Sequence, residues 1–401
     1  MPPLPNLRHL DVFLELARQR SISAGARAVH LSQPAVSQIV AGLESAFGTR
    51  LFERTSEGVT TTEAGEHVRI RAARAWQQIL DGLAEAGYAE SGERRLPGAA
   101  HAMTTVQLQA LAAVAEHGGF GAAARAVGLA RPSLHRAAKQ LERRLGVTLF
   151  ETTTFGVRPT REAERLARRI RLAFAEIAQA RAEVDALRGA DTGRTVIGAM
   201  PLARSCLVPA AALEFAASYP RHQLAILEGA YDALIEALRR GRADLLVGAL
   251  REAVPHSDIV QQHLFDDTLA IIIRTGHPLD SRSAPLPGDM ARYPWIVARQ
   301  GSPLRQQFED LFEAGGVAAP VVSIECNSLV AARELLLDSD CITLLSARQV
   351  RREIAAGMLV ALPHPQGRVT RPIGLTLRSD WQPTAAQRAF LDVLRRHAGA
   401  V

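Results

Sequence analysis

The chain has 401 residues, 47% of them apolar, and carries a formal net charge of +6. This length predicts two to four domains with cores of ordinary size. No apolar run approaches the roughly 18–20 residues that span a bilayer, and the N-terminus lacks the basic start and apolar stretch of a signal peptide. We therefore expect a cytoplasmic protein with no membrane partner.

An internal repeat occupies the N-terminal half of the chain. Residues 7–65 recur at 105–163 with a constant offset of 98 and no gap. The run from Ala24 to Leu31 corresponds to Ala122 to Leu129, and Leu51 to Glu53 correspond to Leu149 to Glu151. Two long copies are typical of a duplicated small domain rather than of a solenoid.

Each copy predicts the same series of short elements. In copy one, apolar residues at helical spacing indicate a first helix over residues 7–20, followed by a second around 24–29. Ser32 then caps a third helix, which has Pro34 in its first turn and stops near Gly48. Residues 51–61 predict two short strands, and a longer helix begins near residue 62. This order is that of a winged helix-turn-helix; an all-α packing module that binds no nucleic acid is the alternative.

The positive charge is concentrated in copy two. Residues 101–190 hold 14 Lys or Arg against 8 Asp or Glu, whereas the segments on either side are balanced. Such a segment predicts a polyanion-binding surface, although a solvated Arg-rich helix face has the same composition. The third helix of copy two carries Arg131, Arg136 and Lys139, while that of copy one has no Lys or Arg between Ser32 and Thr49.

Two segments follow the copies. Residues 86–101 are rich in glycine and predict a linker between the copies. Residues 160–187 predict one helix with an apolar stripe at a spacing of three to four residues. The stripe requires a partner, which is either a second subunit or a surface of the same chain.

From residue 194 onward, short apolar strands alternate with helices, as in parallel sheets with crossover helices. We predict strands at 195–200, 223–228, 244–250 and 375–378 in a first lobe, and at 269–273, 295–297, 322–325 and 342–345 in a second. Helices are expected at 207–219, 231–240 and 384–397. Two α/β lobes would bind a small molecule in the cleft between them.

The residues that carry copy one resemble the DNA-binding domain of LysR-type transcription regulators. They are Ser23 to Gln38, Leu43-Glu44, Gly48, Leu51 to Arg54 and Thr62 to Gly65. Copy two matches more loosely. Residues 226–245 and 325–346 are similar to the effector-binding domain of the same family, which looks like a periplasmic binding protein. The resemblance covers nearly the whole chain, but the usual family plan has one winged domain rather than two.

The resemblance implies that DNA contacts come from the start of each third helix and from each wing. In copy one these residues are Ser32, Gln33, Pro34, Ala35, Ser37, Gln38 and Arg54. In copy two they are Arg131, Ser133, His135, Arg136 and Lys139, with Arg158 at the tip of the wing. Glutamine can pair with adenine edges, whereas cations neutralise phosphates. We therefore expect copy two to supply most of the phosphate affinity, while copy one reads sequence or acts as a packing partner.

The family analogy also places effector contacts at strand ends and helix starts of the two lobes. They are Pro201, Leu202, Ala203, Arg204, Glu228, Gly229, Ala249, Gln300, Ser302, Asn327 and Ser328. Backbone N–H groups at helix starts, hydroxyls and nearby arginines suit a small carboxylate, although each residue could instead serve a turn or a cap. The analogy further implies that the 160–187 helix pairs two subunits, in a homodimer or a homotetramer.

Other classes of function fit the sequence less well. Cys206, Cys326 and Cys341 form no CxxC pair and have no histidine at metal-ligand spacing. We expect reduced thiols, with no metal and no cofactor; a disulfide or a redox sensor is the alternative. The sequence contains no GxSxG, P-loop or HExxH motif, each of which would indicate an enzyme. An architectural DNA-binding protein with a vestigial ligand domain, or a soluble ligand receptor, would leave half of the chain unexplained.

The predicted architecture therefore has four segments. Copy one with its following helix occupies 1–85, a linker 86–101, copy two with its linker helix 102–190, and an effector-binding domain of two α/β lobes 191–401. The predicted function is sequence-specific transcription regulation, in which a small-molecule effector bound between the lobes controls binding to double-stranded DNA.

Overall fold

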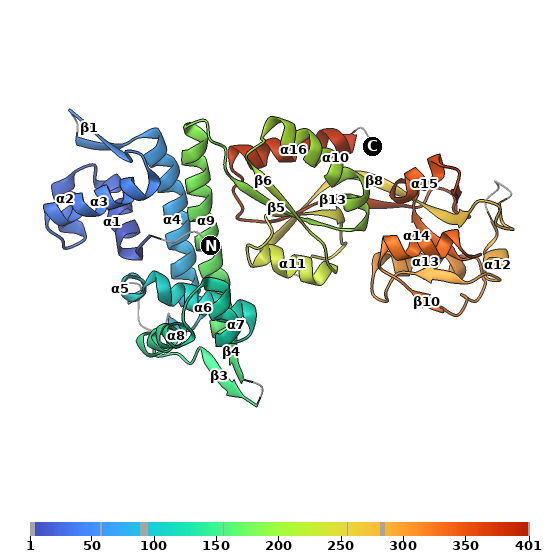
Figure 1. Cartoon of the computed structure of the whole chain (residues 1–401), viewed down its shortest axis with the longest axis horizontal. Helices are drawn as coiled ribbons and strands as arrows, with labels where there is room; N and C mark the ends of the chain where they lie inside the picture. Colours follow the sequence, from blue (N-terminus) through green and yellow to red (C-terminus); the bar gives the residue numbers. More distant parts are fainter. Residues whose placement is uncertain are drawn as a thin grey trace.

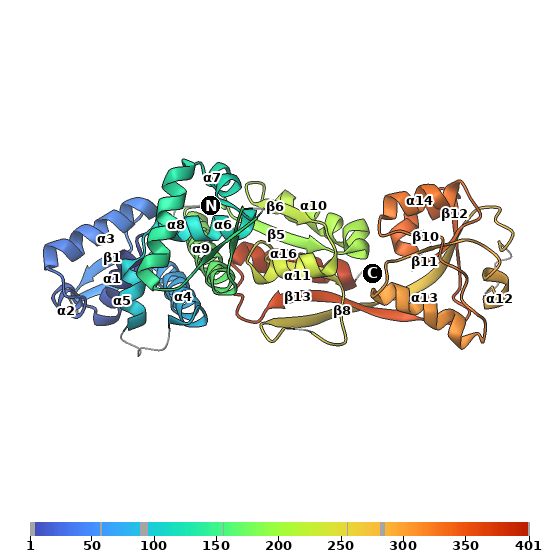
Figure 2. The same cartoon turned by 90° about the horizontal axis from the view of Figure 1, so that it is seen from below.

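The computed structural model describes residues 5–56, 58–88, 95–154, 156–254, 256–280 and 285–399. Figure 1 shows a helical N-terminal half, followed along the long axis by two successive α/β lobes. Figure 2 shows the same succession from below. Among the helices described, none is both long and apolar enough to cross a membrane.

Copy one folds as the winged helix-turn-helix that its sequence predicts. Its elements are α1 (Leu7–Gln19), α2 (Ile22–Ala28), α3 (Gln33–Phe47), β1 (Phe52–Thr55), β2 (Gly58–Thr61) and α4 (Glu63–Glu85). The Ser32 hydroxyl accepts a hydrogen bond from Ala35 N at the start of α3, and Gly48 ends that helix at φ 68°. β1 and β2 pair antiparallel as the wing.

Copy two repeats these elements after one additional helix. The elements are α5 (Arg95–Ala102), α6 (Thr105–His117), α7 (Phe120–Val127), α8 (Arg131–Leu145), β3 (Phe150–Thr153), β4 (Gly156–Pro159) and α9 (Arg161–Leu187). The copies also share polar contacts: Glu44 Oε1 accepts from Leu51 N at 2.8 Å, and Glu142 Oε1 accepts from Leu149 N at 2.9 Å. In both copies a carboxylate thus fastens the third helix to the wing.

The segment predicted as a linker is partly helical. Residues 89–94 lie outside the described residues, but α5 follows them directly. His101 on α5 pairs through Nε2 with Asp11 Oδ2 of α1 at 2.8 Å, and its ring lies 5.3 Å from that of Trp76 on α4. The glycine content predicted a linker, and its end forms a helix that packs against α1 and α4 of copy one and against α8 of copy two.

The long helices that follow the two copies pack against each other within one chain. α4 and α9 lie side by side in Figure 1. They run antiparallel, because Arg71 near the start of α4 contacts Glu183 near the end of α9, while Glu85 at the end of α4 contacts Arg169 near the start of α9. The stripe of α9 is buried in a single apolar core that extends from Leu7 to Val184. The expectation that this stripe pairs two subunits is therefore corrected: its partner is α4 of the same chain.

The C-terminal half forms the two predicted lobes. The first lobe contains β5 (Arg194–Ala199), a π-helical turn (Ala203–Leu207), α10 (Val208–Ser218), β6 (Gln223–Leu227), α11 (Tyr231–Arg239), β7 (Leu245–Ala249) and α16 (Ala385–Gly399). The second contains α12 (Pro287–Met290), β9 (Trp295–Val297), α13 (Pro303–Ala314), β10 (Ile324–Glu325), α14 (Leu329–Leu337), β11 (Ile342–Ser346), a 3-10 turn (Ala347–Val350), α15 (Arg351–Ala355) and β12 (Leu359–Leu362).

Two long strands are shared by the lobes. β8 (Ile259–Arg274) and β13 (Thr370–Arg378) pair antiparallel, and the strand order is β10-β9-β11-β8-β13-β7-β5-β6, with β12 also on β8. Figure 1 shows both strands passing from one lobe to the other. The predicted strand at 269–273 is thus only the end of β8, and the predicted strand at 375–378 is only the end of β13. The register between β8 and β13 shifts between Ile373 and Gly374, where any Cβ on Gly374 would lie 2.1 Å from Gln262 O.

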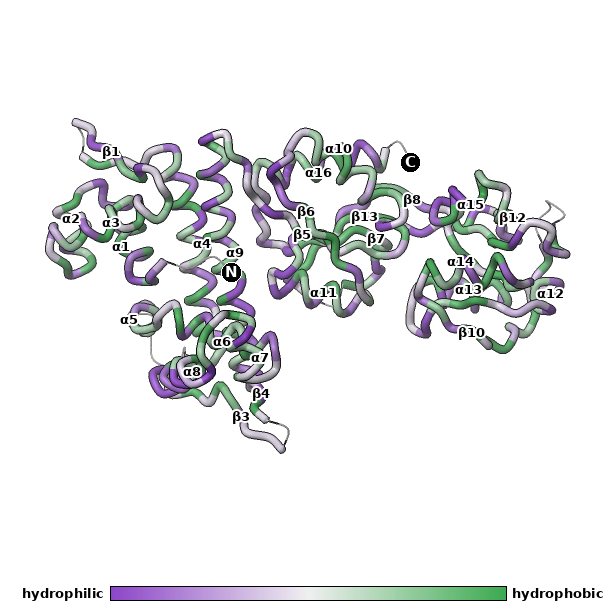
Figure 3. Tube along the Cα trace, viewed as in Figure 1, coloured by the Kyte–Doolittle hydropathy of each residue, from purple (hydrophilic) through white to green (hydrophobic). Residues whose placement is uncertain are grey.

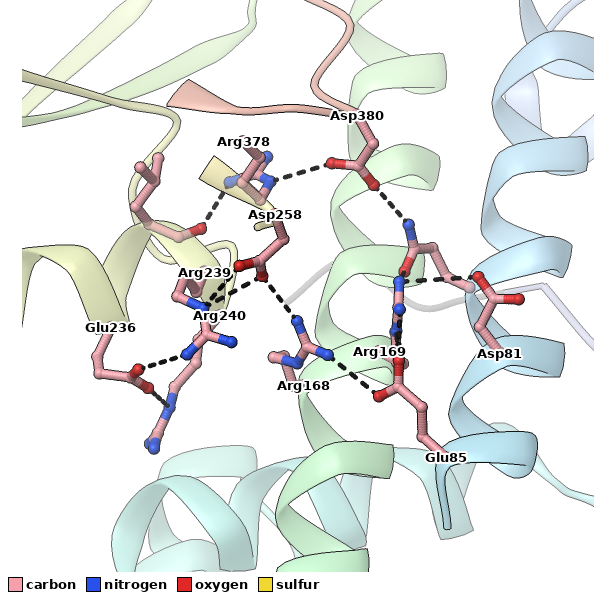
Figure 4. Close-up of polar contacts among 12 residues, drawn as sticks. Asp81, Glu85, Arg168, Arg169, Glu236, Arg239, Arg240, Asp258, Arg378 and Asp380 are labelled. Carbon is pink, nitrogen blue, oxygen red and sulfur yellow. Dashed lines mark hydrogen bonds and ion pairs between the residues drawn. The ribbon is translucent and has the colours of Figure 1, made fainter. Parts of the chain in front are cut away.

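The first lobe docks on the α4/α9 pair through charged side chains (Figure 4). Arg168 on α9 bridges Asp258 of the lobe and Glu85 of α4, each at 3.1 Å. Gln78 of α4 donates to Asp380 Oδ2 at 2.9 Å. The C-terminal half therefore contacts both helices that follow the winged copies.

Candidate functional site

The start of α3 presents a polar, uncharged surface. Ser32, Gln33, Pro34, Ser37 and Gln38 are exposed, and Ala35 is half-buried. Gln33 Nε2 donates to Ser23 Oγ at 3.0 Å, which orients this side chain at the turn between α2 and α3. Val36, Leu43 and Phe47 on the opposite face of α3 are buried. The predicted reading face of copy one is thus free of protein contacts that would cover it.

The start of α8 presents a cationic surface in the corresponding place. Arg131 and Arg136 are exposed, and neither has a hydrogen bond or ion pair with any of the described residues. Lys139 is half-buried and pairs with Glu142 at 2.6 Å. His135 is exposed, with its ring 4.8 Å from that of Phe120. Figure 3 shows α8 as a mainly hydrophilic helix.

The wings carry one predicted arginine each, at different places. Arg54 is exposed on β1, opposite Val59. Arg158 is exposed on β4, opposite Glu151. It therefore lies within the strand, and not at the tip where the sequence placed it. Ser133, at the first turn of α8, is half-buried.

A cleft of about 230 Å³ lies between the two lobes of the C-terminal half. Eight of the predicted effector residues line it: Pro201, Leu202, Arg204, Gly229, Ala249, Ser302, Asn327 and Ser328. Three lie elsewhere. Ala203 is fully buried in the core of the first lobe. Glu228 lies outside the lining and pairs with Arg204 at 3.0 Å. Gln300 also lies outside the lining, and its backbone N–H donates to Glu325 Oε2 at 3.3 Å.

Several lining residues already serve the local structure. Ser302 caps α13 and also donates to Arg299 O at 2.8 Å. Ser328 caps α14, accepting from Ala331 N at 3.3 Å. Asn327 Oδ1 accepts from Arg299 N at 3.1 Å. The cleft wall is thus held in place by caps and side-chain to backbone bonds, and the first turns of both helices begin at its edge.

The cleft is cationic. Arg204, Arg251, Arg299 and Arg371 line it, whereas no Asp or Glu belongs to the lining that the described residues provide. Three of these arginines have a carboxylate partner: Glu228 for Arg204, Asp232 for Arg299 at 3.3 Å and Asp267 for Arg371 at 3.0 Å.

Arg251 has no carboxylate partner among the described residues, and its guanidinium lies over the ring of Tyr231 at 4.4 Å from the ring centre. Gln261 fixes its backbone through two hydrogen bonds of 2.9 and 2.8 Å. Burial lowers the pKa of Arg251, against the opposing influence of Tyr231 and Asp232. A bound anion would offset the cost of holding this charge in the cleft.

Tyr231 adds a second unsatisfied group to the same wall. Its hydroxyl is buried and has no hydrogen-bond partner among the described residues. Burial raises the pKa of this hydroxyl, with Arg251 opposing the shift and Asp232 reinforcing it. The hydroxyl therefore stays protonated at neutral pH and remains able to donate. Buried polar groups without a partner are rare in folded proteins and mark a place where a ligand or water binds.

The sequence reasoning did not assign Tyr231, Arg251 and Arg371 to the cleft. Tyr231 begins α11, Arg251 follows β7, and Arg371 lies on β13. Tyr231 and Arg251 closely follow positions that were predicted, so extending each strand end by two residues would have found them. Arg371 reaches the cleft only through the pairing of β13 with β8 and had no local signal.

Comparison with known families matches these regions separately. The "LysR substrate binding domain" family matches residues 188–399. The "Bacterial regulatory helix-turn-helix protein, lysR family" matches twice, at residues 7–66 and 105–164. The chain belongs to the LysR family. Like other members, this LysR-family protein is a DNA-binding transcription regulator with a C-terminal effector-binding domain.

The curated relatives of this LysR regulator are themselves named as regulators. The HTH-type transcriptional regulator GalR of Pseudomonas putida is 33% identical over 394 residues, covering 98% of this chain and 97% of that protein. PcaQ of Agrobacterium fabrum is 30% identical over 295 residues, which are 73% of this chain but 94% of that protein. PcaQ thus matches about three quarters of the chain over nearly all of its own length, whereas GalR matches almost the whole of both chains.

Solved structures support the fold of the LysR regulator. A full-length OxyR variant from Pseudomonas aeruginosa has a TM-score of 0.54 at 22% identity, covering 74% of this chain and 95% of that one. CbnR, described as a LysR family transcriptional regulator, has a TM-score of 0.51 at 21% identity, covering 73% and 98%. CbnR complexed with its target DNA also has a TM-score of 0.51.

Proposed function

We propose that both winged copies of this regulator contact double-stranded DNA, through α3 and α8 and through their wings. The contacts of copy one are assigned to Ser32, Gln33, Pro34, Ala35, Ser37, Gln38 and Arg54, and those of copy two to Arg131, Ser133, His135, Arg136, Lys139 and Arg158. The support is that most of these side chains are exposed at the two helix starts and the wings, and that Arg131 and Arg136 have no anionic partner among the described residues. Since chromosomal DNA is the target, we place the regulator in the cytoplasm.

We further propose that the effector is a small carboxylate bound in the cleft between the lobes. One observation carries this assignment: Arg251 lines the cleft without a carboxylate partner, beside a Tyr231 hydroxyl that has no acceptor among the described residues. A carboxylate would accept from both groups in a charge-assisted arrangement. The eight predicted residues that line the cleft remain in the proposed site, whereas Ala203, Glu228 and Gln300 leave it because they do not line the cleft.

The effector assignment is tested by thermal shift of the full-length chain with acetate, succinate and benzoate, each compared with its primary amide. We expect stabilisation by at least one carboxylate and by none of the amides. The variant Arg251→Gln should weaken that binding roughly 10- to 100-fold, because a hydrogen bond to a charged group contributes about 1.5–3 kcal/mol. Arg352→Gln, an exposed change on α15, is the matched control. Equal stabilisation by amides, or full binding by Arg251→Gln, would reject the assignment.

A homodimer or homotetramer would have to form through surfaces other than the stripe of α9. That stripe packs against α4 of the same chain. We therefore propose that any assembly of several chains is formed by the effector-binding domains.

A further inference from the structure

The contacts between α4 and α9 occur in symmetric pairs. The repeat offset of 98 relates Arg71 to Arg169 and Glu85 to Glu183. Arg71 Nη2 donates to Glu183 Oε1 at 2.6 Å, and Arg169 Nε donates to Glu85 Oε1 at 2.9 Å. Replacing each residue by its counterpart in the other copy therefore turns one ion pair into the other.

Two further contacts of these arginines obey the same rule. Arg71 Nη1 donates to Glu176 at 3.0 Å, and the equivalent Arg169 Nη1 donates to Gln78 at 2.8 Å, where residue 176 is the counterpart of residue 78. Arg71 also donates to Gln179 at 2.6 Å, and Arg169 pairs with Asp81, the counterpart of residue 179, at 3.7 Å. Three contacts on one side therefore reappear on the other.

This pattern is that of an isologous interface, in which residue i contacts j and the equivalent of j contacts the equivalent of i. Such an interface has a twofold axis, here an approximate one inside a single chain. The two winged copies consequently lie at opposite ends of the α4/α9 pair, with α3 and its wing at one end and α8 and its wing at the other (Figure 1).

The interface is also closed to a second chain. α4 and α9 approach so closely at Gly82 that a Cβ there would lie 2.8 Å from the Cβ of Arg169 and 2.9 Å from Leu166 Cδ1. Ile79 and Leu83 on α4 and Ile170 on α9 are fully buried. The faces that would receive the long helix of another subunit are occupied.

We propose that one chain is a complete paired DNA reader. A single molecule binds one duplex at two adjacent half-sites, with α3 in the first and α8 in the second, and no second chain supplies a winged module to the pair. This inference rests on the proposed function, because it assumes that both copies contact DNA. Paired helix-turn-helix modules bind half-sites about one helical turn apart, roughly 10–10.5 base pairs between centres.

The two half-sites must differ in sequence. A twofold pair of identical modules selects a palindromic operator, but here α3 presents glutamines where α8 presents arginines. The preferred duplex therefore has two unlike halves, one selected by polar contacts to bases and one held more through phosphates.

A disulfide between α4 and α9 tests whether the pair forms within one chain. The double variant Gly82→Cys/Arg169→Cys is made with the three native cysteines replaced by alanine, and oxidised without DNA. The Cβ atoms need to separate by only about 1 Å to reach disulfide geometry. We expect a covalent link within one chain, seen on a non-reducing gel as a species of single-chain mass, whose two introduced thiols react with a maleimide only after reduction. The control Gly98→Cys/Arg169→Cys should form no such link, because Arg169, like the rest of the described residues, has no atom within 4 Å of a Cβ at Gly98.

Two results would overturn the pairing: a covalent species of twice the chain mass, or no disulfide in a variant whose circular dichroism matches that of the parent. Native mass spectrometry of the unmodified chain with a duplex gives an independent count of chains per duplex. Duplexes selected by that chain from a random pool should carry two half-sites per bound chain. One half-site per chain would contradict the proposal.

The disulfide reports on the pairing of the two copies, and the selected pool reports on DNA binding. If the selected pool shows no enrichment but the intramolecular disulfide forms, DNA binding fails while the pairing of the copies stands. If duplexes are enriched and bound but the disulfide joins two chains, the regulator assignment stands and the single-chain reader is rejected.

Discussion

The third helices of the two winged copies share a scaffold but present different chemistry to solvent. At equivalent positions α3 has Gln33 and Gln38, whereas α8 has Arg131 and Arg136. Both helices begin with a proline in the first turn, bury their opposite faces and connect to a wing through a glutamate. The comparison teaches that folding constraints are met by the buried face, the first-turn proline and the glycine that ends each helix, which leaves the exposed face free to specialise.

At the interface of α4 with α9 the two copies have the same arginine, but its burial differs between them. Arg71 and Arg169 are equivalent and make equivalent contacts, but the Arg71 side chain is only 4% exposed, against 21% for Arg169. The cause is the effector-binding domain, since Arg71 Nη1 also donates to Gln382 O at 2.9 Å. The domain thus breaks the symmetry of the pair by covering the cluster around Arg71 more completely than the cluster around Arg169.

The largest expected effect tests this difference in burial. Arg71→Ala would remove the buried partner of Glu176 and Glu183, leaving Arg74 at 2.8 Å from Glu176 and His67 at 3.6 Å from Glu183, and should cost about 3 kcal/mol of unfolding free energy, the lower end of the range for a broken buried pair. Arg169→Ala removes the equivalent but more exposed arginine and should cost about 1 kcal/mol. Urea denaturation followed by circular dichroism measures both. Equal losses would show that the docked domain does not distinguish the two clusters.

The next largest effect concerns the charge of α8. The triple variant Arg131→Ala/Arg136→Ala/Lys139→Ala should lower DNA affinity about a hundred- to a thousandfold and reduce the salt slope of binding by about 2–3, because binding releases one counterion fewer for each phosphate left without its cation. Arg351→Ala/Arg352→Ala/Arg368→Ala removes the same charge from exposed positions of the effector-binding domain. An unchanged slope in the α8 variant, or an equal change in this control, would remove α8 from the DNA contact.

The smallest effect concerns sequence reading by α3. Gln33→Ala/Gln38→Ala should cost about 1–3 kcal/mol for each base that its glutamine no longer reads, and only on the preferred duplex. Binding to a scrambled duplex and the salt slope should both stay unchanged, since neither side chain carries a charge. Equilibrium titration of the two duplexes at several salt concentrations measures this. Equal weakening on both would mean that copy one packs against DNA or protein without selecting sequence.

The winged copies and most lobe strands were predictable from the sequence because their signals are local. Ser32, Pro34 and Gly48 fix the two ends of α3 through capping and backbone geometry, and α3 begins and ends where these residues place it. Short apolar runs such as Trp295 to Val297 gave strands of the same extent. Eight of eleven predicted effector residues line the cleft, because strand ends and helix starts meet there.

What could not be predicted depends on partners distant in the sequence. The apolar stripe of α9 shows that a face is buried but not by which surface, and α4 is its partner only in three dimensions. The first half of β8 contains Gln261, Gln262 and His263, which break the apolar run that would have indicated one long strand. Arg371 belongs to the cleft because β13 crosses between the lobes.

The covalent tether between the winged copies changes how the regulator would respond to its own abundance. Modules held on one chain meet at a fixed effective concentration, whereas separate subunits must find each other by diffusion. Dilution therefore leaves the α4/α9 pair intact, and the number of paired modules rises in direct proportion to the number of chains. For a pair assembled from two chains at concentrations well below its dissociation constant, that number would rise more steeply, approaching the square of the chain concentration.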